Sequence, residues 1–128
     1  MKSLHSLDPS SHHFLKLRLL ILLKKYSSSS TPGPDHISWN YLKILVNNSR
    51  YITNFVNIAN SCINLGHWLL YFKKSTLIII PKPNKPVYNS LKTFWPIFLL
   101  NALGKLIEKA IGERLQIYSI ASNFVHLN

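Results

Sequence analysis

The stretch of sequence that decides the fold begins Thr76-Leu77-Ile78-Ile79-Ile80-Pro81-Lys82-Pro83-Asn84-Lys85 and returns through Thr93-Phe94-Trp95-Pro96-Ile97-Phe98-Leu99. Its first part is apolar, rich in β-branched residues and closed by a proline, which predicts a buried strand over residues 76–80. Prolines and small polar residues predict a rigid polar loop after that strand. The returning segment is also extended, and Pro96 limits it to a sheet edge or a bulge. We therefore expect a short antiparallel β-hairpin.

Two helices are predicted before the hairpin. Ser38 is a suitable N-cap for the first helix, which ends at Asn47-Asn48-Ser49. Gly66 stands where the C-terminal cap of the second helix belongs. Apolar residues at helical spacing predict the packed faces, which are Trp39, Leu42, Leu45 and Val46 in the first helix and Ile52, Phe55, Val56, Ala59, Cys62 and Ile63 in the second.

A third helix is predicted after the hairpin, from an Asn101 cap to about Tyr118. Its charged residues lie off an apolar stripe formed by Leu103, Leu106, Ile107, Ala110, Ile111 and Leu115. These elements together predict an α+β fold that is mainly helical, with one short antiparallel β-hairpin.

The first part of the chain is expected to be a tail followed by a short helix. Residues 1–13 are expected to be disordered, and an amphipathic helix with a basic end should follow. Its apolar positions are Phe14, Leu17, Leu20 and Ile21, and its basic end is Lys24-Lys25. The run from Ser27 to Asp35 cannot continue this helix, because Pro32-Gly33-Pro34 enforces a turn.

The charge balance favours a polyanionic partner. Fifteen Lys and Arg face four acids in 128 residues, which gives a formal net charge of +11. Cys62 is the only cysteine, so an intrachain disulfide is excluded and an intracellular setting, nucleus or cytoplasm, is expected. No apolar run is long enough to span a membrane. The basic, serine-containing residues 1–26 leave organelle targeting as an alternative.

The acidic residues do not form a catalytic pair. Asp8 lies in the expected tail and Asp35 in the turn, while Glu108 and Glu113 are five residues apart on one helix. At ~100° per residue their side chains diverge by about 140°. Metal-dependent nucleotidyl transfer requires carboxylates placed together, so we expect no catalytic residue, metal site or cofactor in this chain on its own.

Basic residues concentrate around the predicted hairpin instead. Lys73, Lys74, Lys82, Lys85 and Lys92 fall within twenty residues that contain no acid, interleaved with aromatic residues. Such a surface can hold phosphates while aromatic rings stack on bases. The alternative is that the lysines only keep a hydrophobic hairpin soluble and the aromatic rings belong to the core.

Three motifs in one order resemble the fingers region of reverse transcriptases from non-LTR retrotransposons, the LINE-like elements common in fungi. They are Thr31-Pro32-Gly33-Pro34-Asp35, then Ile78-Ile79-Ile80-Pro81-Lys82-Pro83-Asn84-Lys85, then Phe94-Trp95-Pro96-Ile97 running through Asn101 into Gly104-Lys105-Leu106-Ile107-Glu108-Lys109. The resemblance covers about residues 26–128, so that residues 1–25 form a separate tail and helix. It implies a partial fingers subdomain of a right-hand polymerase, with the palm absent.

The resemblance also implies roles for individual residues. Lys82, Lys85 and Lys74 would be vestigial nucleotide- or phosphate-binding residues, and Pro32, Gly33, Pro34 and Asp35 would form a structural turn. The family has an arginine where this chain has Trp95, and an indole cannot replace its bidentate, charged contact to a triphosphate. The chain ends before the family's Gln-x-Gly segment and before the palm aspartates that bind Mg²⁺.

We therefore expect a truncated, inactive fragment of an RNA-directed DNA polymerase from a transposable element. Its unpaired palm-facing surface is expected to cause association or aggregation. The alternative is a small, basic, non-catalytic protein that binds RNA or DNA through the hairpin.

Overall fold

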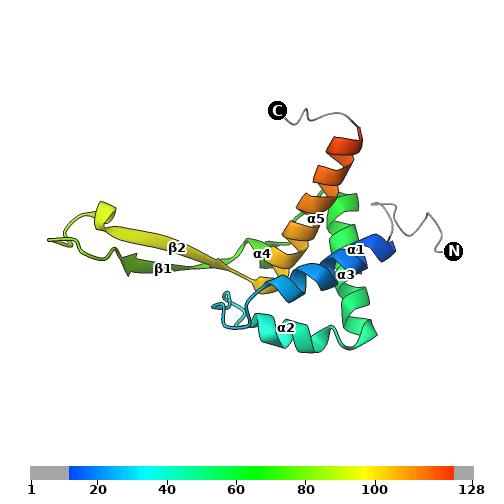
Figure 1. Ribbon diagram of the computed structural model, residues 1–128, viewed down its shortest axis with the longest axis horizontal. Helices are drawn as coiled ribbons and strands as arrows, with labels where there is room; N and C mark the ends of the chain where they lie inside the picture. The colour runs from blue at the N-terminus through cyan, green and yellow to red at the C-terminus, as the bar shows by residue number, and fades with distance from the viewer. Residues whose placement is uncertain (1–11, 123–128) are drawn as a thin grey trace.

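A cluster of helices carries a long β-hairpin in the computed structural model, which describes residues 12–122 (Figure 1). The elements, in chain order, are α1 (His12–Lys25), α2 (Trp39–Leu45), α3 (Ser49–Leu65), α4 (Leu70–Lys73), β1 (Ser75–Pro81), the 3-10 turn η2 (Leu91–Thr93), β2 (Phe94–Leu100) and α5 (Ala102–Ala121). The expected fold class, α+β and mainly helical with one antiparallel hairpin, is confirmed.

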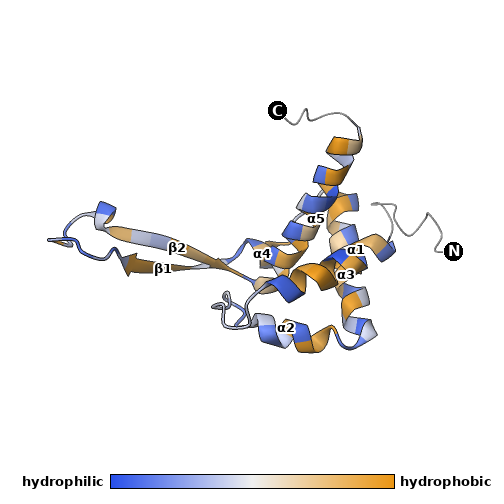
Figure 2. Ribbon diagram, in the orientation of Figure 1, coloured by the Kyte–Doolittle hydropathy of each residue, from blue (hydrophilic) through white to orange (hydrophobic). Residues whose placement is uncertain are grey.

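The hydrophobic core lies where α1, α2, α3 and α5 meet, as the apolar faces in Figure 2 show. Phe72 of α4 closes it on the side of the hairpin. The remaining core residues are Leu15, Leu19, Leu22 and Leu23 of α1, Trp39 and Leu42 of α2, Ile52, Phe55, Val56 and Ala59 of α3, and Ala102, Leu106, Ile107 and Ala110 of α5. Helix α1 therefore belongs to the same core as the rest of the chain.

The buried face of α1 differs from the predicted one. Leu15 and Leu19 are buried, whereas Leu17 and Ile21 are each 43% exposed. The apolar run from Leu19 to Leu23 supplies apolar residues all round the helix, so spacing alone did not identify the packed side. His12 and His13, expected to be disordered, begin α1. The rest of the expected tail, residues 1–11, lies outside the described residues.

Local capping determines ends of α2 and α3, and the caps at Ser38 and Gly66 are the predicted ones. The Ser38 hydroxyl accepts a hydrogen bond from the Tyr41 backbone N–H at 3.2 Å, and the Asn48 side chain accepts one from the Arg50 N–H at 3.0 Å. Gly66 ends α3 with φ +60°, a left-handed conformation that glycine adopts without strain. These short-range bonds explain why the loops between helices could be located from sequence.

Helix α5 begins after Asn101 as predicted, but the Asn101 side chain does not cap it. The predicted stripe is correct at Leu106, Ile107 and Ala110 and wrong at Leu115, which is 63% exposed. Leu115 lies beyond Ala110, the last residue of α5 that is buried in the core. Glu113 lies off the stripe and accepts a hydrogen bond from Arg18 Nε of α1 at 2.9 Å, which fixes the two helices to each other.

The prediction that residues 76–80 form a buried strand is wrong about burial. Strand β1 pairs with β2 in antiparallel register, with Ile78 opposite Ile97, and every residue of β1 is exposed. The hairpin extends away from the helices (Figure 1), and no other described element covers either face of it. An apolar strand is usually buried on both faces, so this hairpin has the composition of an interior strand without an interior around it.

No helix within residues 12–122 is long and apolar enough to cross a membrane.

Candidate nucleic-acid interface

The ladder of the hairpin accommodates two prolines without losing a hydrogen bond. The Lys82 backbone N–H bonds to the Thr93 carbonyl at 2.8 Å, so Lys82, Ile80 and Ile78 direct their backbone groups toward β2. By alternation, the residues between them direct theirs outward, and these include Pro81. Pro96 lies opposite Ile79, at an outward position of β2. Neither proline removes a donor from the ladder.

The end of the hairpin is ordered by its own hydrogen bonds. Lys82 Nζ donates to the Lys92 carbonyl at 2.8 Å, and the Tyr88 hydroxyl donates to the Lys82 carbonyl at 2.7 Å. The Tyr88 ring packs on Phe94 with centroids 5.8 Å apart. Asn84 takes φ +58°, a left-handed turn position that asparagine tolerates well. These contacts hold the proline-containing loop, residues 82–93, in place between the two strands.

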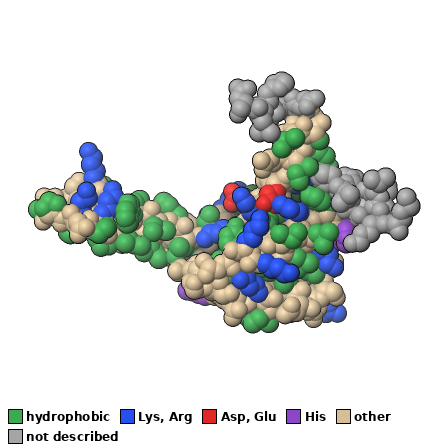
Figure 3. All heavy atoms as spheres, viewed as in Figure 1, with side chains coloured by type: hydrophobic (Ala, Val, Ile, Leu, Met, Phe, Trp, Pro, Cys, Tyr) green, Lys and Arg blue, Asp and Glu red, His purple; other side chains and the backbone are tan. Residues whose placement is uncertain are grey.

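Three lysines gather at this end, which lies far from the helices (Figure 3). Lys85 and Lys92 are exposed, and Lys82 is half-buried. The ammonium groups of Lys85 and Lys92 have no hydrogen-bond or ion-pair partner among residues 12–122. No acidic residue occurs between Lys73 and Asn101. The end of the hairpin is thus a compact positive charge on an apolar stem.

The structure brings together only two of the three lysines expected to bind phosphate. Lys82 and Lys85 share the loop, whereas Lys74 precedes β1 at the other end of the hairpin. At ~3.3 Å per residue, the eight residues from Lys74 to Lys82 separate their Cα atoms by roughly 26 Å. The third lysine beside Lys82 is instead Lys92. Lys92 was predicted to belong to the basic segment but was not named as a phosphate-binding residue.

Trp95 lies on the surface close to the basic end. It pairs with Ile80 across the hairpin and is 48% exposed. Strand alternation puts Ile80, Trp95 and Lys82 on the same face. The indole of Trp95 and the side chain of Lys82 therefore lie on one face near the end of the hairpin.

The Pro32-Gly33-Pro34-Asp35 turn is fixed to the base of the hairpin. Gly33 is buried against the backbone of Leu100 and Asn101. The Asp35 N–H donates to Asn101 Oδ1 at 3.2 Å, and Asn101 Nδ2 donates to the Tyr71 carbonyl at 3.0 Å. The turn, α4 and the start of α5 are thereby joined through one buried amide.

A third bond completes this cluster. The Tyr71 hydroxyl donates to Asp35 Oδ2 at 2.6 Å. The bond to that carboxylate, with burial and the negative charge of Asp35 as smaller causes, raises the pKa of Tyr71 to about 12. Tyr71 was expected only as an aromatic residue of the basic segment and Asn101 only as a helix cap, because the groups that meet here are 66, 36 and 30 residues apart.

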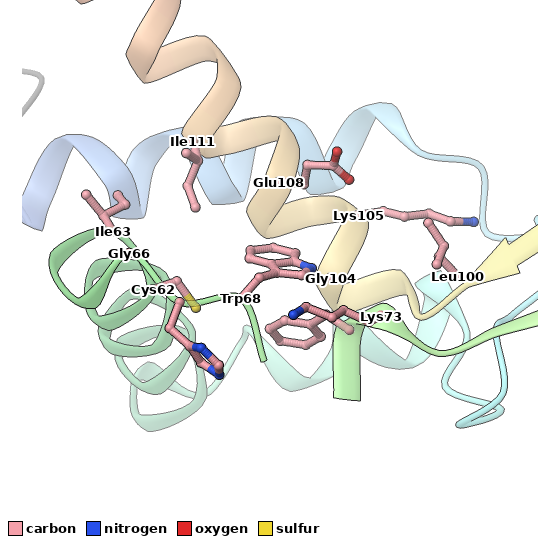
Figure 4. A pocket seen from close by; sticks show the side chains of 12 residues that line it. Cys62, Ile63, Gly66, Trp68, Lys73, Leu100, Gly104, Lys105, Glu108 and Ile111 are labelled. Atoms are coloured by element: carbon pink, nitrogen blue, oxygen red, sulfur yellow. The ribbon is translucent and has the colours of Figure 1, made fainter. Parts of the chain in front are cut away.

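A cavity of about 620 Å³ lies at the junction between the hairpin and the helices. In Figure 4, Cys62 and Ile63 of α3 face Trp68 and α5 across it. Lys73, Lys105 and Glu108 line it beside Leu100 and Ile111. Its charges are mixed in sign, unlike those at the end of the hairpin, so its electrostatics do not select a polyanion.

Carboxylates are scattered in the structure. Glu113 pairs with Arg18, Asp35 belongs to the turn, and Glu108 lines the cavity. Within residues 12–122, no three His, Cys, Asp or Glu residues lie close enough together to hold a metal ion.

No protein-family model matches the chain, and no curated protein matches its sequence.

Proposed function

We propose that this chain is a fingers-side fragment of a retroelement reverse transcriptase, that it contacts nucleic acid through the end of its hairpin, and that it transfers no nucleotide by itself. The observation that carries the proposal is the basic end of the hairpin, where Lys82, Lys85 and Lys92 meet without any acid in the whole segment. The motifs that resemble this polymerase family fall on the turn before α2, on the hairpin and on the start of α5.

The chemistry at this end is phosphate neutralisation. Lys82 uses one ammonium proton on the Lys92 carbonyl and keeps two for an incoming phosphate oxygen. Lys85 and Lys92 add charge without needing to break an existing bond. Trp95 offers an aromatic face for a base on the same side as Lys82. Together these groups suit a single strand whose bases are accessible.

Single-stranded RNA affinity, measured across a salt series, tests the contact. We expect the triple variant Lys82→Ala, Lys85→Ala, Lys92→Ala to lower the slope of log K against log salt by roughly 2, because each neutralised phosphate contributes ~0.7 to that slope. The matched control removes three exposed charges elsewhere, as Lys24→Ala, Lys25→Ala, Lys109→Ala. An equal reduction of the slope in both triples, or no binding at low salt, would refute the proposal.

A primer-extension assay with Mg²⁺ tests the absence of catalysis. The purified chain is expected to incorporate no nucleotide, because it offers no pair of carboxylates to hold the metal ions. Template-dependent incorporation would contradict this part of the proposal.

The same basic end also supports a second candidate, a small basic protein that binds RNA or DNA and has no polymerase ancestry. Trp95→Arg distinguishes the two, because it restores the arginine of the resembling family. Polymerase ancestry predicts a several-fold gain in affinity for a nucleoside triphosphate, since a guanidinium binds phosphate bidentately. Leu91→Arg, which adds the same charge at a position that is 90% exposed, is the control. Equal gains would favour the second candidate.

A further inference from the structure

The outer edge of β1 carries unpaired backbone groups. Its inward groups bond to β2, and no other strand among residues 12–122 pairs with its outer side. By the alternation that places Lys82 inward, Ser75, Leu77 and Ile79 direct their N–H and carbonyl groups outward. No charged residue and no proline interrupts residues 75–80. Such an edge is a template for another strand.

The outer edge of β2 is less suitable. Pro96 occupies an outward position near the middle of the strand, so that edge lacks a donor where a partner would need one. In β1 the outward proline is Pro81, at the very end of the strand, where its carbonyl can still accept. The two edges of the hairpin therefore differ, and β1 is the one able to extend the sheet.

We propose that two copies of this chain associate through β1, antiparallel and two-fold symmetric, with Ile78 of one copy beside Ile78 of the other. In this register Leu77 exchanges both backbone bonds with Ile79 of the second copy, and the Ser75 N–H meets the Pro81 carbonyl. In this register, the outward backbone N–H and carbonyl groups of one copy lie opposite those of the other over the whole of Ser75–Pro81.

A second copy also satisfies the apolar composition of the hairpin. A two-stranded hairpin is marginal in water, whereas more strands with an apolar face are stable. In the proposed register, Leu77 and Ile79, 50% and 59% exposed, lie next to Ile79 and Leu77 of the second copy on one face. Ile78, 37% exposed, contacts its own counterpart on the other face. In this register the side chains of residues 77–79 face only apolar side chains of the second copy.

The register has one unfavourable consequence that makes it testable. Lys82 of each copy faces Lys74 of the other, because the strands run in opposite directions. Like charges opposite each other weaken strand pairing, and salt screens them. Association should therefore strengthen with salt, whereas binding of nucleic acid weakens with it. The two proposals predict opposite salt dependences.

Sedimentation of the purified chain without nucleic acid tests the association. We expect a monomer–dimer equilibrium that shifts toward the dimer at high salt. Leu77→Pro removes an outward donor of β1 and should abolish the dimer. Phe98→Pro changes the outward residue directly opposite on β2 and should leave the dimer intact. Cross-strand proton contacts between Ile78 and Ile97 establish that each hairpin has formed.

Charge reversal tests the register without disturbing the strand. Lys82→Glu or Lys74→Glu should each strengthen the dimer at low salt by on the order of tenfold, since each creates two opposite-charge pairs. The double variant faces Glu with Glu and should lose that gain. Lys85→Glu changes the net charge equally but lies off the ladder, so its effect should be smaller.

Failure of this inference is distinguishable from failure of the proposed function. A chain that stays monomeric at all salt concentrations overturns the dimer even if it binds RNA. Equal dissociation of the dimer by Leu77→Pro and Phe98→Pro also overturns it. So does a double variant, Lys74→Glu with Lys82→Glu, that forms the dimer as strongly as either single variant.

Discussion

Gly33 is required at its position because of space and not because of backbone conformation. A Cβ atom there would lie 2.5 Å from the carbonyl carbon and oxygen of Leu100 and 2.6 Å from the Asn101 nitrogen. These are backbone atoms at the junction of β2 and α5, which cannot move as a flexible side chain can. The left-handed conformation of this turn is taken by His36, at φ +59°. The glycine thus lets the turn touch the hairpin base.

Gly33→Ala is therefore expected to destabilise the protein by about 2 kcal/mol, since the turn must shift to relieve the overlap. Gly112→Ala is the matched control. Gly112 is an exposed residue within α5, and a Cβ atom there meets nothing within 4 Å. That change should stabilise by about 0.5 kcal/mol through helix propensity. Urea unfolding measures both, and a neutral Gly33→Ala would contradict the close packing of the turn.

The hydrogen bond from Tyr71 to Asp35 makes the stability of the protein depend on pH in the alkaline range. The pKa of Tyr71 is raised to about 12 from 10, so the folded state holds this proton more tightly than the unfolded chain. The stability that it contributes is complete below pH 10 and is lost as pH rises from 10 to 12. We expect Tyr71→Phe to cost about 1 kcal/mol at neutral pH, the value of an ordinary hydrogen bond.

The same variant provides the check on the pH dependence. Between pH 10 and 12, the free energies of unfolding of the wild type and of Tyr71→Phe should converge. A difference that stays constant over this range would show that the hydroxyl does not stabilise the fold through Asp35.

At the scale of elements, the packed face of α1 is the main correction to the sequence-based prediction, and it can be tested directly. Leu19→Ala removes a fully buried side chain and should cost about 3 kcal/mol. Leu17→Ala, two residues away and 43% exposed, should cost less than about 1 kcal/mol. Thermal or urea unfolding of the two variants distinguishes the faces. The reverse order would mean that the predicted face is the packed one.

What could be predicted from sequence was local. Ser38 and Gly66 were located correctly because capping depends on neighbours within a few residues. The pairing of the two strands was also predictable, since two apolar extended segments joined by a proline-rich loop have few other partners nearby in the chain.

What could not be predicted depends on distant groups. The role of Asn101 arises from contacts to Asp35 and Tyr71, which no local pattern indicates. The exposure of β1 depends on what surrounds it, and an isoleucine-rich strand has the same sequence whether it is covered or open. Lys74 was grouped with Lys82 by nearness in sequence, but an extended strand separates residues more than any other element does.

At the scale of the whole molecule, charge and apolar surface are arranged along one axis. The helices hold the core, the strands are apolar, and Lys82, Lys85 and Lys92 lie at the far end, while other Lys and Arg residues lie over the helices (Figures 2 and 3). The two proposed interactions share Lys82, since it contacts phosphate in one and faces Lys74 in the other. RNA bound there would neutralise the repulsion between the two copies.

Binding of RNA and association of the chain should therefore strengthen each other at low salt. A short single-stranded RNA is expected to shift the sedimentation equilibrium toward the dimer, and the shift should vanish at high salt where the repulsion is already screened. An RNA that instead dissociates the dimer would show that both partners compete for the same surface.

The packing of α1 against α5 has a consequence for how the protein is made. Arg18 and Glu113, which join these helices, are 95 residues apart in the chain. During synthesis the leucine face of α1 leaves the ribosome long before the residues of α5 that cover it. Meanwhile the hairpin, whose contacts are local, can already form. The nascent chain thus carries two apolar surfaces at once, and α5, once it has emerged and folded, buries only the one on α1.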